Sequence, residues 1–115
     1  MGLLKNIEQD NGITLSYHRV VSVTETTNIN NTIEIKSYLN KNQRLKEKSY
    51  DELVEKGKNN LLTDEETEIV KNGINLYTDT SYIDLPYDDT MTIANAYEYL
   101  KTTDDFKNAE NDLEA

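Results

Sequence analysis

The stretch from residue 10 to residue 38 constrains the fold more than any other part of the chain. Apolar and polar residues alternate along residues 13–24, and a second run rich in β-branched residues follows an Asn-rich turn. A period of two residues is typical of strands with one buried face, and the preceding Asn11-Gly12 pair favours a tight turn. The pattern predicts a long β-hairpin, with a short earlier strand that ends near Gln9.

Strict alternation assigns a face of the hairpin to each side chain. The residues expected to face the core are Ile13, Leu15, Tyr17, Val21, Val23, Ile33 and Ile35. The more exposed face is expected to carry Thr14, Ser16, His18, Ser22 and Thr24. Val20 breaks the alternation, which indicates either a β-bulge or a partly covered outer face. Three antiparallel strands in a meander are the simplest arrangement of this region.

Two local signals predict helices after the hairpin. A hydroxyl residue precedes a glutamate by three positions at Ser49 and again at Thr63, as in the capping box of a helix start. We therefore expect helices over residues 50–57 and 64–72, each followed by a glycine that ends it. Residues 49–73 are interpreted as a peripheral helical insertion. The apolar residues expected to hold it to the sheet are Leu61, Leu62 and Ile74.

The last third of the chain regains β character and then becomes helical. Residues 74–85 predict a fourth strand, which Pro86 ends because proline has no N–H for the ladder. A helix is expected from about Thr92, and Phe106 is expected to return to the core, while residues 111–115 fray. The helix is predicted from an apolar stripe, which consists of Ile93, Ala96, Tyr97 and Leu100.

These elements define an expected fold class. A length of 115 residues fits a single domain with one modest core, spanning residues 1–115. The class is α+β: an antiparallel β-meander of three to four strands, with a peripheral two-helix insertion and a C-terminal helix packed on the sheet.

Charge is distributed unevenly along the chain. Residues 1–63 hold nine Lys and Arg against eight Asp and Glu, whereas residues 64–115 hold three against fourteen. Because an acidic half repels phosphates, we expect no direct binding of nucleic acid. Two interpretations of the acidic half stay open: a solvated surface, or a surface for a basic protein that mimics the charge of a nucleic acid.

Several kinds of chemistry find no support in the residues. Cysteine is absent, which excludes disulfides and thiolate sites, and His18 is the only histidine, which excludes zinc sites with two or more imidazoles. No Gly-rich phosphate loop occurs, and the carboxylates at residues 79–89 lack the spacing of a calcium-binding loop. We expect a protein that is not an enzyme and has no metal or cofactor. We also expect neither a signal peptide nor a membrane span.

Both ends of the chain resemble known proteins. The segments that carry the resemblance are residues 5–13, 17–22, 82–88 and 96–101. They are similar to small proteins carried by tailed phages and prophages of low-GC Gram-positive bacteria and encoded near tail and baseplate genes. The resemblance implies a virion component of the tail, or an assembly factor in the host cytoplasm, and it carries over no functional residues.

Two functions follow as expectations. The first is a non-enzymatic structural or assembly protein of the phage tail or baseplate, whose partners are other phage structural proteins or further copies of itself. The alternative is an acidic inhibitor of a host enzyme or defence nuclease. Contact is expected on the outer face of the hairpin, beside the basic run at residues 36–48, and at a tyrosine. The candidate contact residues are Thr14, Ser16, His18, Val20, Lys41, Arg44 and Tyr87.

Overall fold

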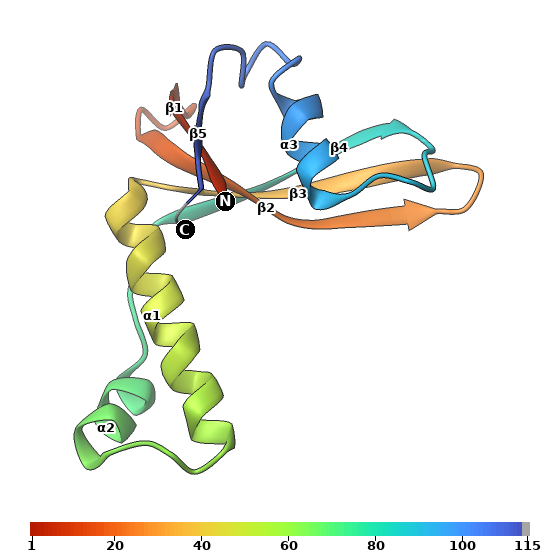
Figure 1. The fold of residues 1–115 in the computed structure, drawn as a ribbon. Coiled ribbons are helices and arrows are strands. Elements are labelled where there is room, and N and C mark those ends of the chain that lie inside the picture. Colours follow the sequence, from red (N-terminus) through yellow and green to blue (C-terminus); the bar gives the residue numbers. More distant parts are fainter. Residues whose placement is uncertain (114–115) are drawn as a thin grey trace.

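A computed structural model describes residues 1–113 and has an α+β fold (Figure 1). Five antiparallel strands form one sheet in the order β4-β3-β2-β1-β5. The strands are β1 (Gly2–Glu8), β2 (Thr14–Thr26), β3 (Asn30–Tyr38), β4 (Thr78–Pro86) and β5 (Glu110–Asp112). The helices are α1 (Lys41–Lys58), α2 (Asp64–Asn72) and α3 (Ile93–Leu100). The predicted fold class is confirmed, and β5 is a strand beyond those predicted.

The predicted hairpin is present as the long ladder between β2 and β3. Its register shifts between Val20 and Ser22, so the β-bulge interpretation of Val20 is confirmed. The bulge overturns the predicted face assignment at this point. Val20 is 5% exposed and packs in the core, whereas Val21 is 38% exposed.

The two faces of the sheet are covered by different elements. Helix α3 packs on one face, called here the α3 face, and the first turns of α1 lie on the opposite α1 face (Figure 1). Alternate residues of β3 point to the two faces: Ile35 joins the core under α3, while Lys36 and Tyr38 bond to α1. The buried core of the α3 face consists of Leu3, Val20, Ile33, Ile35, Leu85, Ala96, Tyr97, Leu100 and Phe106.

Helix α1 begins earlier and ends later than predicted. Its N-cap is Asn40, whose side chain accepts a hydrogen bond from the amide of Gln43, so the basic run is helical and Ser49 lies inside the helix. Gly57 also lies inside α1, which continues to a cap at Asn59. The predicted limits of 50–57 were wrong because Asn40, nine positions before Ser49, already caps the helix.

Helix α2 follows its sequence signals closely. Thr63 and Glu66 form the reciprocal capping box, and Gly73 ends the helix at a φ of 72°. Tyr50 donates to the carbonyl of Val70 at 3.1 Å, and this bond joins α2 to α1. We call the pair α1 and α2 the helical arm. Leu61 and Ile74, which were expected to hold it to the sheet, are 66% and 39% exposed, so this expectation was wrong.

The C-terminal part of the chain covers the α3 face. Ala96, Tyr97 and Leu100 of α3 are buried as predicted, whereas Ile93 is 44% exposed. Phe106 is buried in the core, as expected. The expected fraying from residue 111 was wrong for residues 111 and 112, because β5 pairs with β1 along the edge of the sheet. Residues 114 and 115 of the expected tail lie outside the described residues.

The helical arm gives the molecule an extended shape. Arg44 and Glu47 are the only buried residues of α1, and both lie near its start, so the rest of the helix leaves the sheet (Figure 1). The Cα radius of gyration is 16.3 Å. A compact domain of this length has a radius of about 13 Å. The arm therefore stands away from the sheet instead of folding back on it.

Candidate functional site

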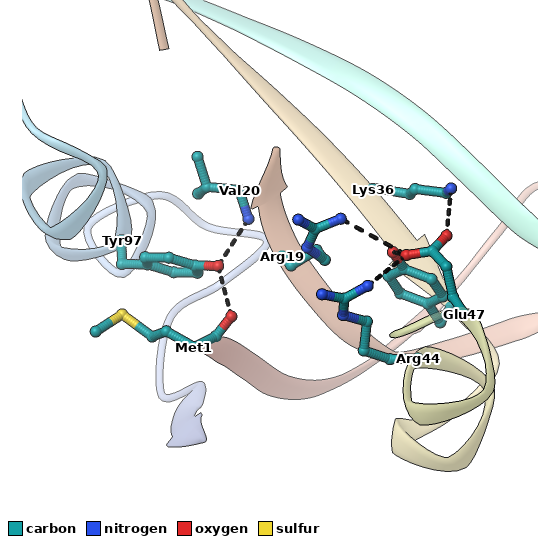
Figure 2. Close-up of polar contacts among 8 residues, drawn as sticks. Met1, Arg19, Val20, Lys36, Arg44, Glu47 and Tyr97 are labelled. Carbon is teal, nitrogen blue, oxygen red and sulfur yellow. Dashed lines mark hydrogen bonds and ion pairs between the residues drawn. The ribbon is translucent and has the colours of Figure 1, made fainter. Parts of the chain in front are cut away.

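The helical arm joins the sheet at a buried charged cluster centred on Glu47. The carboxylate accepts hydrogen bonds from Lys36 Nζ at 2.5 Å, from the Tyr38 hydroxyl at 2.5 Å and from Arg44 Nη1 at 2.6 Å. Arg19 Nη1 lies 3.6 Å away (Figure 2). Glu47 is 6% exposed. One carboxylate thus gathers three cations and one hydroxyl from β2, β3 and α1.

The cluster holds Glu47 in its ionised form. Burial alone would raise the pKa of Glu47, but the hydrogen bonds from Lys36 and Tyr38 and the nearby positive charges outweigh burial and keep the pKa below its ordinary value. Burial and the bond to Glu47 raise the pKa of Tyr38 to about 12, so its hydroxyl stays protonated and donates. The chemistry of the cluster is therefore that of an anchor, which fixes the direction in which the arm leaves the sheet.

A second feature is a partly enclosed cavity of 370 Å³ on the α3 face. Its interior is formed by His18, Ser37 and Phe106, which are buried. The carboxylates around it come from β1, the following turn, β4 and the loop after α3, and no Lys or Arg is among its described lining residues. The four acidic residues are Glu8, Asp10, Asp79 and Asp105. All four are exposed, so the cavity is negatively charged at its mouth.

His18 lies below this cavity and is 1% exposed, so its predicted position on the exposed face was wrong. The Lys5 carbonyl, 2.7 Å from Nε2, only accepts, so Nε2 carries the proton. The Ser37 hydroxyl then donates to Nδ1 at 2.7 Å. Burial lowers the pKa of His18, although the bond to Lys5 opposes this shift, and the imidazole is neutral. Its edge-on contact with Phe106 completes a fixed, fully bonded core residue.

The buried neutral His18 predicts a pH-dependent stability. As the pH falls below about 6.5 the unfolded chain binds a proton at this residue more readily than the folded chain, so stability falls as the pH falls, by at most about 1.4 kcal/mol per pH unit. Urea unfolding across this range measures the slope. A His18→Gln variant should lose it, and an unchanged slope in that variant would assign the effect to other groups.

The seven candidate contact residues are scattered. Thr14 is exposed, and Ser16 is half-buried and donates to the Leu39 carbonyl at 2.7 Å. His18 and Val20 are buried under the α3 face, where no partner reaches them in this conformation. On the α1 face, Arg44 is buried against Glu47, and half-buried Lys41 pairs with Asp112 at 3.1 Å. Tyr87 is half-buried after β4, so the structure brings these residues to no common patch.

Sequence reasoning missed both the Glu47 cluster and the cavity. Arg44 and Glu47 stand three positions apart after an Asn cap, which is a detectable helical pair. Nothing local indicated that this pair is buried against Lys36 and Tyr38. The cavity has no local signal, because its lining comes from segments more than ninety residues apart.

Among residues 1–113, no group of three or more His, Asp or Glu side chains is arranged to hold a metal ion. No described helix combines the length and the hydropathy needed to cross a bilayer.

Comparisons of the chain with models of protein families, with curated proteins and with solved structures find no match.

Proposed function

We propose that this chain is a non-enzymatic structural or assembly protein of a phage tail or baseplate, which works through protein–protein contacts in the virion or during assembly in the host cytoplasm. The resemblance of both ends to phage proteins supports the setting. The observation that carries the mode of action is the helical arm, which projects from the sheet and leaves apolar side chains in solvent. These exposed residues of the arm and the segment after it are Leu45, Leu61, Ile69, Ile74 and Tyr77.

The arm has the properties of a docking element. No apolar residue of α1 or α2 is buried, so their own packing leaves apolar area to cover. The Glu47 cluster meanwhile holds the arm at a fixed angle to the sheet. A projecting, pre-oriented surface loses little freedom on binding, which favours association.

The proposal predicts that the protein is recovered with tail or baseplate proteins. Mass spectrometry of purified particles and of assembly intermediates is the measurement. Replacing exposed Leu61 and Ile69 by serine should reduce this recovery without changing the fold, whereas Glu68→Gln on the same helix should leave it unchanged. Recovery only from the soluble lysate, with no tail protein bound, would contradict the proposal.

The alternative function, inhibition of a host enzyme or defence nuclease, draws support from a different surface. Among the described carboxylates from residue 64 onward, all are exposed except Glu66 and Asp112. Such a surface suits the basic groove of a nucleic-acid enzyme. This alternative predicts a complex with a basic host protein that dissociates as salt is raised. Extracts that yield only tail proteins at low salt would eliminate it.

A further inference from the structure

The outer side of β4 is open for strand pairing. β4 is the last strand of the sheet, pairs with β3 on one side, and has no strand on its other side among residues 1–113. Its residues from 79 to 82 are exposed. The opposite edge strand, β5, is only three residues long, so β4 is the longer of the two edges.

β4 lacks most of the devices that protect sheet edges. Edge strands are commonly blocked by lysines, bulges or proline, which prevent another strand from pairing. β4 contains no Lys or Arg, its register with β3 runs without a shift, and its proline is the final residue, Pro86. The regular edge that is available is therefore the part of β4 that precedes Pro86. The charges that β4 does carry are negative, at Asp79 and Asp84.

The acidic cavity lies directly beside this edge. Asp79, Ser81 and Ile83 are alternate residues of β4 and line the cavity on the α3 face. In an antiparallel pair, side chains on the same face of neighbouring strands lie about 5 Å apart. A strand added to β4 would therefore bring every second side chain to the mouth of the cavity.

The lining of the cavity specifies what such a side chain should be. Apolar groups of Ile7, Ile83 and Phe106 accompany the four carboxylates. Lys and Arg match both features, because their aliphatic stems pack on apolar surface while the charged head stays near water and carboxylates. A second copy of β4 would fit less well, because the only charged side chains of β4 are aspartates and like charges on paired strands repel.

We propose that β4 binds an extended, basic segment of a partner protein by strand addition, with a Lys or Arg side chain in the acidic cavity. The proposal rests on the proposed function in that both require a protein partner, and it names the chemistry of one contact. Main-chain hydrogen bonds supply affinity along the edge, and the cavity supplies specificity for a cation on the α3 face.

The test is titration of the full chain with a capped hexapeptide, Thr-Lys-Val-Lys-Val-Thr, followed by NMR of the β4 amides. Saturable shifts in β4 are expected. The Asp79→Asn/Asp105→Asn double variant should bind about five- to tenfold more weakly. Its charge-matched control, Asp64→Asn/Glu65→Gln on α2, should bind within about twofold of the unaltered chain. Equal affinity of the two double variants would overturn the role of the cavity.

A second probe separates strand addition from simple attraction of cations. Peptides N-methylated at every residue keep the lysines but have no main-chain N–H to donate from either edge, and they should not bind β4. Equal binding of the methylated peptides, or of a peptide with Glu in place of Lys, would overturn the proposal. These outcomes do not depend on whether the protein is found in particles, so this proposal and the proposed function can fail separately.

Discussion

Replacement of Glu47 by alanine is expected to lower the free energy of unfolding by about 3–5 kcal/mol, the cost of removing one partner from a buried charged cluster. The variant leaves Arg44 buried without its carboxylate and removes the acceptor of the buried Tyr38 hydroxyl. Positive charges from β2, β3 and α1 then repel one another. Urea unfolding at neutral pH, followed by far-ultraviolet circular dichroism, measures the loss.

A matched control is available further along the same helix. Glu55 pairs with Lys58 at 3.3 Å, and both side chains are more than two-thirds exposed. Glu55→Ala should cost about 0–1 kcal/mol, as is usual for exposed pairs. Glu47→Gln keeps the shape of the side chain and one acceptor oxygen. Its loss of unfolding free energy should therefore lie between those of Glu47→Ala and Glu55→Ala. Equal losses in Glu47→Ala and Glu55→Ala would show that the cluster does not anchor the arm.

Local signals predicted the parts of the fold that local interactions decide. The capping box at Thr63, the glycine at residue 73 and the apolar stripe of α3 each act within a few residues, and each was predicted near its observed place. The start of α1 was missed because the prediction began the helix at the capping-box pattern of Ser49, whereas Asn40 caps it in the structure. Two competing signals of one type cannot be ranked from spacing alone.

The faces of β2 show where tertiary structure decides the outcome. Strict alternation placed His18 outside and Val21 inside, but β2 is covered on both faces near its middle, and a bulge shifts the register beyond Val20. One face of β2 is covered by α1 and the other by α3 and Phe106, and all of these come later in the sequence than the strand. A period of two residues indicates that one face of a strand is buried, but it does not predict whether the other face is covered as well.

The candidate sites also combine features that the sequence indicates with features that only tertiary contacts decide. The excess of acids after residue 63 supplies only two of the four carboxylates at the mouth of the cavity, Asp79 and Asp105, while Glu8 and Asp10 come from the start of the chain. The position of the cavity beside a free edge depends on the strand order, in which β4 pairs with β3 at the border of the sheet. Strand order depends on contacts between distant segments, so the combination of edge and cavity emerges only in the folded chain.

Tyr97→Phe is expected to cost about 1–3 kcal/mol, because it removes the hydrogen-bond acceptor of the buried Val20 amide. The hydroxyl of Tyr97 accepts from the Val20 amide at 2.9 Å and donates to the Met1 carbonyl at 2.8 Å (Figure 2). Val20 stands next to the bulge, and this one hydroxyl ties α3 to both β2 and the start of the chain.

The loss of stability in Tyr97→Phe should be detectable at the bulge itself as well as in the unfolding of the whole chain. Amide hydrogen exchange at Val20 should accelerate in Tyr97→Phe, since the amide loses its hydrogen bond to the Tyr97 hydroxyl, while urea unfolding reports the total cost. Tyr82→Phe makes the same chemical change at a residue that is 65% exposed and donates weakly at 3.4 Å, and it should be within about 0.5 kcal/mol of the unaltered chain. Unchanged exchange at Val20 would mean that the bulge, and with it the burial of Val20, is held by packing of the core alone.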